Sequence, residues 1–103
     1  MNSPGDGQPV LYKVIPTGVA SKLLKQRHLE AIQAGRGAPF LAAFRQIVER
    51  LRKDPLVFGE PLYRLKALQL EIRQGIVLPL VVDYAVDEQR RLVYIRGCKA
   101  LSS

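Results

Sequence analysis

The residues of this chain best suited to chemistry are arginines and lysines in its second half. They are Arg64, Lys66, Arg73, Arg90, Arg91, Arg96 and Lys99. Guanidinium and ammonium groups bind phosphate and carboxylate, and they neutralise charge that develops on a reacting phosphate. Over the whole chain, 16 Lys and Arg against 9 Asp and Glu give a formal charge of +7. This excess favours a nucleic acid or an acidic protein as partner; the alternative is a basic surface that serves solubility alone.

Other kinds of chemistry find little support. His28 is the only histidine and Cys98 the only cysteine, so neither a zinc site built from several such ligands nor an internal disulfide can be assembled. A Ser-His-acid triad would have to use His28 from inside a helix, without a nucleophile-elbow motif. Asp83, Asp87 and Glu88 lie near one strand, and we expect them to be solvated or paired with arginines. The sequence therefore predicts no metal and no cofactor.

Length and composition favour one small domain. The chain has 103 residues, of which 48% are apolar and 24% charged, as in ordinary globular proteins. Residues 1–9 contain Pro, Gly and Ser without a large apolar residue after Met1, so we expect a flexible N-terminal tail followed by a single domain over 10–103. Neither a secretion signal nor a membrane-spanning run is evident, and a lone cysteine suits a reducing compartment. We therefore expect a cytoplasmic protein.

The first half of the domain reads as one strand and two helices. Val10–Ile15 is predicted to be a short strand that stops at Pro16. A helix should follow, capped by Thr17 or Ser21 and ending near Gly35, with an apolar stripe of Ala20, Leu23, Leu24, Ala31 and Ile32. A second helix, which ends near residue 53, has the clearest stripe: Phe40, Leu41, Phe44, Ile47, Val48 and Leu51. The short turn between them predicts an antiparallel helical hairpin.

The segment 54–62 separates helical spacing from the alternation of strands. Its two prolines end the second helix, and Gly59 between them permits a change of direction. Alternation from Leu68 to Arg73 predicts a second strand with Leu70 and Ile72 on its buried face, broken at Gly75. Two further strands should follow, one over 78–87 with Pro79 at its start and one over 92–96, joined as an antiparallel hairpin.

This order, β-α-α-β-β-β, predicts a two-layer α+β fold in which the helical hairpin packs on a small antiparallel sheet. Arg73 would end the second strand, Arg96 would end the fourth, and Lys99 would follow at once, so these cations are expected to converge on one edge or face. Arg90 and Arg91 should belong to a solvated turn at the opposite end. Tyr84 and Tyr94 are expected in the core by their strand parity; stacking on nucleic-acid bases is the alternative.

With these features the chain resembles the RelE/ParE toxin superfamily over about residues 10–99. The resemblance is carried by Asp54-Pro55, Phe58-Gly59-Glu60-Pro61-Leu62, the strand ending in Arg73, Val82-Asp83-Tyr84-Ala85-Val86-Asp87 and Gly97-Cys98-Lys99. It implies a RelE-like fold and a toxin-like component of a type II toxin–antitoxin system, held inactive by an antitoxin protein.

In ribonuclease members of that superfamily, basic side chains support metal-independent cleavage of messenger RNA on the ribosome. Cations align the 2′-hydroxyl and neutralise the phosphate, so no metal is required. The resemblance implies catalytic roles for Arg73 and Lys99, with Arg96 as a neighbour of the matched positions. Arg64 and Lys66 are the candidate nucleic-acid-binding residues.

The chain departs from that pattern at three places. Val81 stands where the superfamily has an arginine, Cys98 stands where it has a histidine, and the last residues lack a basic and aromatic tail. A gyrase-inhibiting toxin, which is not a nuclease, would tolerate these changes. A second hypothesis is a non-catalytic module with the same fold that binds a protein or RNA. The expected partners are therefore an antitoxin and, as target, either the ribosome with its messenger RNA or gyrase.

Overall fold

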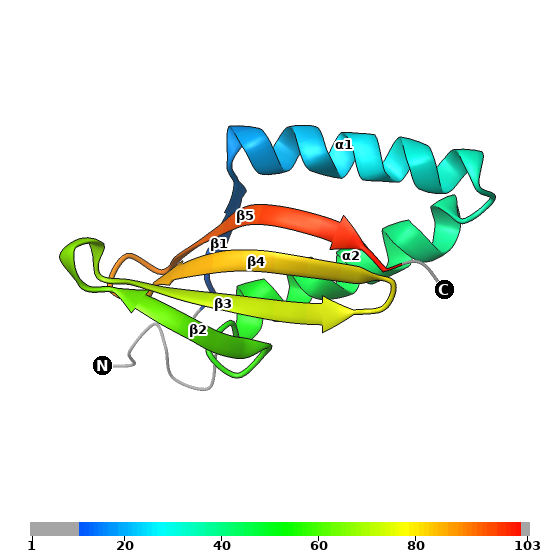
Figure 1. The fold of residues 1–103 in the computed structure, drawn as a ribbon. Coiled ribbons are helices and arrows are strands. Elements are labelled where there is room, and N and C mark those ends of the chain that lie inside the picture. Colours follow the sequence, from blue (N-terminus) through cyan, green and yellow to red (C-terminus); the bar gives the residue numbers. More distant parts are fainter. Residues whose placement is uncertain (1–10, 102–103) are drawn as a thin grey trace.

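The computed structural model describes residues 11–101. The expected tail over 1–9 and the start of the first strand at Val10 lie outside them. The elements are β1 (Lys13–Pro16), α1 (Gly18–Gln33), α2 (Gly37–Lys53), β2 (Glu60–Leu65), a 3-10 turn η1 (Lys66–Leu68), β3 (Leu70–Val77), β4 (Leu80–Asp87) and β5 (Leu92–Ala100). The predicted two-layer α+β architecture is confirmed, with the helices packed on a five-stranded mixed sheet (Figure 1).

The two helices begin and end where local chemistry favours it. Thr17 caps α1 by accepting a hydrogen bond from the Ala20 backbone N–H at 3.1 Å, so Thr17 rather than Ser21 is the cap. After α1, Gly35 adopts φ +74°, which a residue with a side chain rarely takes. Cations in the last turn of α2 face the negative end of its dipole, and Arg50 also pairs with Asp54 at 2.9 Å.

The sheet has the order β1-β5-β4-β3-β2. Strand β1 pairs with β5 in parallel, and the other neighbours are antiparallel. The segment after α2 adds a strand that the sequence reading missed, since β2 begins within it and pairs with β3. The predicted break at Gly75 is wrong, because β3 continues through this glycine to Val77. The last strand also extends past its predicted end, so Lys99 lies inside β5.

Helix α2 and one face of the sheet enclose the core. In Figure 1, α2 lies behind the sheet and α1 runs alongside β5. The buried face of α2 carries Phe40, Ala43, Ile47 and Leu51. These residues join alternate side chains of β4 and β5 in one apolar cluster: Leu80, Val82, Tyr84, Val86, Val93 and Ile95. Helix α1 contributes only Ala20 as a fully buried residue, and Ile32 of its predicted stripe is 53% exposed.

Gly75 is required where the turn after α2 crosses the core face of β3. A Cβ on Gly75 would lie 2.3 Å from Cε2 of Phe58, so only glycine admits this ring. The Phe58 ring also stacks on Tyr84, with centroids 6.1 Å apart, beneath the guanidinium of Arg50 at 5.0 Å. The turn is therefore anchored in the core rather than lying on the surface.

Candidate functional site

The two faces of the sheet separate the candidate cations. Tyr84 and Ile95 point into the core beneath α2. Arg73 pairs with Tyr84 across β3 and β4, and Tyr84 pairs with Ile95 across β4 and β5, so Arg73 lies on the same covered face. Arg96 follows Ile95 and is exposed on the other face, which we call the open face. The prediction that Arg73 converges with Arg96 and Lys99 is therefore wrong.

Arg73 is instead a structural clamp on the turn after α2. Its side chain is only 7% exposed. The Nε–H group donates to the carbonyl of Phe58 at 3.4 Å, and Nη2 donates to the carbonyl of Gly59 at 3.1 Å. The third nitrogen, Nη1, forms an ion pair with Glu71. A buried charge needs such partners, and here they link β3 to the turn.

The pKa values of this cluster follow from its burial. Burial alone lowers the pKa of Arg73, but the hydrogen bond to Glu71 and the nearby Tyr84 hydroxyl outweigh it, so the pKa lies above its ordinary value. Burial also raises the pKa of the Tyr84 hydroxyl above its ordinary 10.0, although the nearby Arg73 charge opposes this. The hydroxyl lies within hydrogen-bond distance of the carbonyls of Pro55, at 2.8 Å, and Phe58. Tyr84 is thus a buried neutral donor.

We expect Tyr84 to make the protein sensitive to alkali. Above pH 10 the unfolded tyrosine loses its proton while the folded one retains it, so the free energy of unfolding falls as pH rises until the folded group also ionises. The slope from one group is at most about 1.4 kcal/mol per pH unit. In urea titrations between about pH 9 and 11, Tyr84→Phe should show a shallower decline than the wild type. Parallel curves would contradict this assignment.

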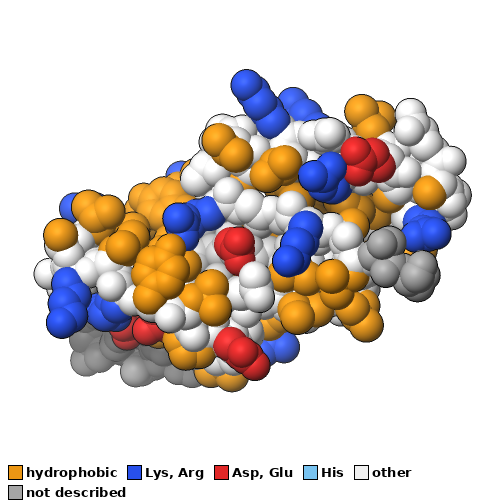
Figure 2. Space-filling view, in the orientation of Figure 1, with side chains coloured by type: hydrophobic (Ala, Val, Ile, Leu, Met, Phe, Trp, Pro, Cys, Tyr) orange, Lys and Arg blue, Asp and Glu red, His pale blue; other side chains and the backbone are white. Residues whose placement is uncertain are grey.

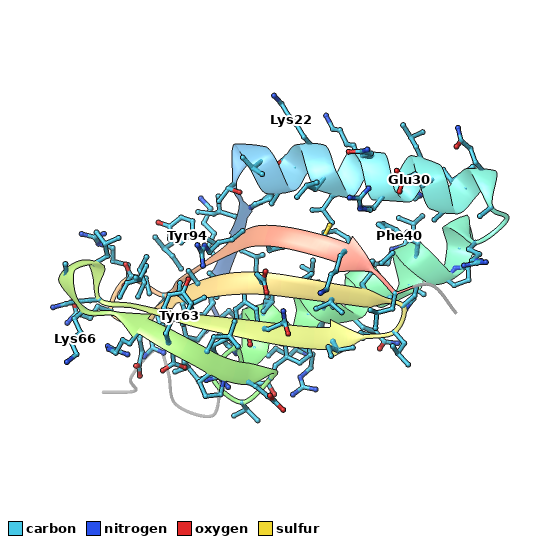
Figure 3. The ribbon with its side chains drawn as sticks, in the orientation of Figure 1. Lys22, Glu30, Phe40, Tyr63, Lys66 and Tyr94 are labelled. Atoms are coloured by element: carbon cyan, nitrogen blue, oxygen red, sulfur yellow. The ribbon has the colours of Figure 1, made fainter. Side chains whose placement is uncertain are left out.

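The open face carries a row of aromatic and apolar side chains, and Arg96 lies beside it. Backbone pairing aligns Tyr63, Ile72, Ala85 and Tyr94 across four strands. Figure 3 labels Tyr63 and Tyr94 of this row. Nη1 of Arg96 lies 3.4 Å from the Tyr63 hydroxyl. Tyr94 is half-buried and outside the core cluster, so its predicted core position is wrong, whereas that of Tyr84 is confirmed. Ile72 is buried, but on the face opposite to the predicted one.

Lys99 lies farther along the same face, beside a small hollow of about 220 Å³. The hollow is also lined by Gln74 of β3, Asp83 of β4 and Leu23 of α1. Asp83 accepts a hydrogen bond from Gln74 at 2.9 Å, so its partner is an amide rather than an arginine. An ammonium group here can bind an anion, although a carboxylate in the same hollow reduces the positive charge. Figure 2 shows such a mixture of basic, acidic and apolar groups over the sheet.

Two positions that differ from the superfamily pattern lie close to Lys99. Val81 pairs with Lys99 and is only 4% exposed. Cys98 is half-buried against the core, and this burial raises the pKa of its thiol, although Arg27 acts in the opposite direction. At neutral pH the thiol is therefore protonated. Neither residue supplies the positive charge or the imidazole that the resemblance implies at these positions.

Arg64 and Lys66 lie at the other end of the sheet, together with Arg91. Strand β4 spans the distance between the two ends: Val81 pairs with Lys99, and Asp87 lies at the end with Arg91. The six residues from Val81 to Asp87 correspond to about 20 Å at 3.3 Å per residue. The candidate nucleic-acid-binding residues and Lys99 thus belong to separate places.

The site residues predicted from the sequence did not include Tyr63 or Arg91. The alternation of Tyr63 and Leu65 with Arg64 could have indicated β2. Arg91 lies in an exposed turn, as expected, but its guanidinium also lies 5.4 Å from the Tyr12 ring centre, and Nη1 donates to the Tyr12 hydroxyl at 3.3 Å. No local pattern reveals a contact between residues so far apart in the chain.

Within residues 11–101, no group of three or more His, Cys, Asp or Glu side chains is placed to hold a metal ion. None of the helices in that range is long and apolar enough to span a membrane.

Together these features define a class of small α+β protein, with helices over one face of a mixed sheet and the other face open. No family model and no curated protein sequence matches the chain. A search of solved structures finds a chain of the crystal structure of the RelBE2 toxin–antitoxin complex from Mycobacterium tuberculosis. The two are 22% identical with a TM-score of 0.59, and the match covers 91% of this chain and 95% of that one. The chain thus has a RelE-like fold, as its sequence resemblance predicts.

Proposed function

We propose that this protein is the toxin-like component of a type II toxin–antitoxin pair. The observation that carries the proposal is the RelE-like fold, which matches a chain from a toxin–antitoxin complex over nearly the full length of both chains. The charge of +7 adds support, because a basic toxin can be covered by an acidic antitoxin segment.

Arg96 and Lys99 are the residues that we propose for contact with the cellular target. Both are exposed on strand β5. Tyr63 and Tyr94 on the same face offer surfaces on which bases can stack, as in other proteins that bind single-stranded RNA. Arg73 cannot join them without leaving its buried partners. The face thus supports target binding better than it supports a three-cation centre for RNA cleavage.

Expression of the chain alone in a bacterial host tests the toxin assignment. Growth should stop on induction, and the double variant Arg96→Ala, Lys99→Ala should restore it. A matched control removes two lysines from α1, Lys22→Ala with Lys25→Ala, and should still arrest growth because both are exposed on another element. If cells grow normally while the wild-type protein is soluble and folded, the toxin assignment fails and the non-catalytic binding module is favoured.

The kind of target is distinguished by the RNA from arrested cells and from a translation extract. New ends within messenger RNA, absent in the Arg96→Ala, Lys99→Ala variant, identify a ribosome-dependent nuclease. Intact RNA with arrested growth indicates that the protein is not a nuclease and acts on another target, such as gyrase. Inhibition of gyrase is then measured by DNA supercoiling assays. The occupation of the superfamily positions by Val81 and Cys98 favours the second outcome.

A further inference from the structure

A hollow of about 630 Å³ lies at the end of the sheet away from Lys99. It is lined by six residues from two turns and the strands beside them: Arg64, Lys66, Gln69, Glu88, Gln89 and Arg91. Figure 3 shows Lys66 at this tip, at the opposite end of the molecule from Phe40. All six of these lining side chains, which belong to the described part of the chain, are polar or charged, and this favours a polar ligand.

The lining has the composition of an anion site. Three cations face one carboxylate, and the two glutamine amides add neutral donors. Arg64 lies 3.8 Å from Glu71, but Glu71 is also paired with Arg73, so one carboxylate is shared between two guanidinium groups. Arg64 remains 55% exposed. The positive charge of the hollow is therefore only partly compensated by these neighbours.

Arg91 is held in place for binding. Its guanidinium stacks on the Tyr12 ring and donates through Nη1 to the Tyr12 hydroxyl. A guanidinium carries five N–H donors in a rigid fork, so this contact fixes its orientation while using one of them. A cation that is already ordered loses less entropy when an anion binds.

The backbone at the hollow has two residues in an unfavourable conformation. Gln69 has φ 54° and Arg91 has φ 56°, and within residues 11–101 these are the only residues other than glycine with positive φ. Glycine would adopt this conformation with less strain. Non-glycine residues held in this way are concentrated at functional sites. Both side chains line the hollow, which indicates a role for the side chains themselves.

We propose that this hollow, which we call the tip site, binds backbone phosphates of a single-stranded nucleic acid. Guanidinium forks match phosphate oxygens, and the polar lining that residues 11–101 supply disfavours a peptide that binds through apolar anchors. The aromatic row of the open face begins close to the tip site, since Tyr63 precedes Arg64 on β2 and Tyr94 lies three residues after Arg91. A nucleic-acid strand bound at the tip site can therefore continue onto this row. The tip site is separate from Lys99 and does not depend on the toxin assignment.

Binding of a fluorescent single-stranded oligoribonucleotide, followed by anisotropy across a salt series, tests the proposal. The double variant Arg64→Gln, Lys66→Gln should bind more weakly and should reduce the slope of log affinity against log salt by about 1.4, since each phosphate contact on a single strand contributes about 0.7. The matched control Lys22→Gln, Lys25→Gln removes the same charge from α1, where Figure 3 shows Lys22 pointing away from the sheet. It should keep the wild-type slope.

Gln69→Gly tests the tip site without adding strain. It removes one amide and permits the same φ, so the protein should unfold at a urea concentration close to that of the wild type while binding the oligoribonucleotide more weakly. Polyglutamate serves as the acidic-peptide probe. The proposal is overturned if the wild type does not bind RNA, or if Lys22→Gln, Lys25→Gln reduces the salt slope as much as Arg64→Gln, Lys66→Gln does. It is also overturned if Arg64→Gln, Lys66→Gln weakens the binding of polyglutamate alone. If Arg64→Gln, Lys66→Gln binds RNA more weakly but still arrests growth, the toxin assignment stands. The two proposals can therefore fail separately.

Discussion

Replacing Gly59 with alanine is expected to lower the free energy of unfolding by about 3 kcal/mol or more. Gly59 has φ +73°, and a Cβ built there would lie 2.4 Å from the carbonyl oxygen of Gln74 and 2.9 Å from its carbon. These are backbone atoms of β3, which cannot move aside without disturbing its pairing with β4. The alanine variant must therefore displace either the turn after α2 or the strand beneath it.

Gly35→Ala is the matched control for this prediction. Gly35 has almost the same φ, +74°, but a Cβ there would have nothing within 4 Å. It should cost only the left-handed backbone conformation, about 1 kcal/mol. Urea unfolding of both variants, with unchanged m values, measures the difference, which reports the clash alone. Equal losses for the two variants would show that the close approach of Gly59 to β3 is not a constraint.

Arg73→Ala is expected to destabilise the protein by about 3 kcal/mol. The substitution removes donors to the carbonyls of Phe58 and Gly59 and leaves Glu71 without its closer cation. Glu71 is still within 3.8 Å of Arg64 and is partly exposed, which limits the loss. The expected result is a lower urea midpoint and easier proteolysis in the turn after α2.

Two further variants separate a structural role for Arg73 from the catalytic role that the resemblance implies. Arg73→Lys keeps the charge but cannot reach both carbonyls and the carboxylate with one ammonium, so stability should stay low. Arg96→Ala removes an exposed arginine and should change the free energy of unfolding by no more than about 0.5 kcal/mol. If Arg73→Ala matches the wild type in stability yet abolishes growth arrest, Arg73 acts on the target and the clamp interpretation is wrong.

Gly59 and Arg73 explain why the segment after α2 matters to the whole molecule. The glycine brings the turn against β3, and the arginine from β3 then holds two of the turn's carbonyls. From there the chain enters β2, which carries Tyr63 to the open face and Arg64 to the tip site. Damage at the clamp should therefore weaken both proposed binding surfaces through the fold.

The sequence by itself determined the two-layer α+β fold and the order of its helices and strands, except for β2. The apolar spacing of α2 is strong because Phe40, Ile47 and Leu51 recur on one helical face, and all three are buried as that spacing predicts. Turn chemistry marked the helix boundaries, with Thr17 before α1 and Gly35 after it. Such signals are local, so one sequence suffices to read them.

Only the tertiary structure decided which face of β3 is the core face. Alternation placed Ile72 in the core and left Arg73 outside, but the structure reverses this, because Gly75 makes room for Phe58 and because the turn's carbonyls satisfy the guanidinium. Ile72 is buried on the other face, in the row with Tyr63 and Tyr94. Both faces of β3 thus contain buried residues, and period-two alternation cannot tell them apart. The separation of Arg73 from Lys99, and the grouping of Arg64 with Arg91, follow from strand register and turns, which bring together residues distant in the chain.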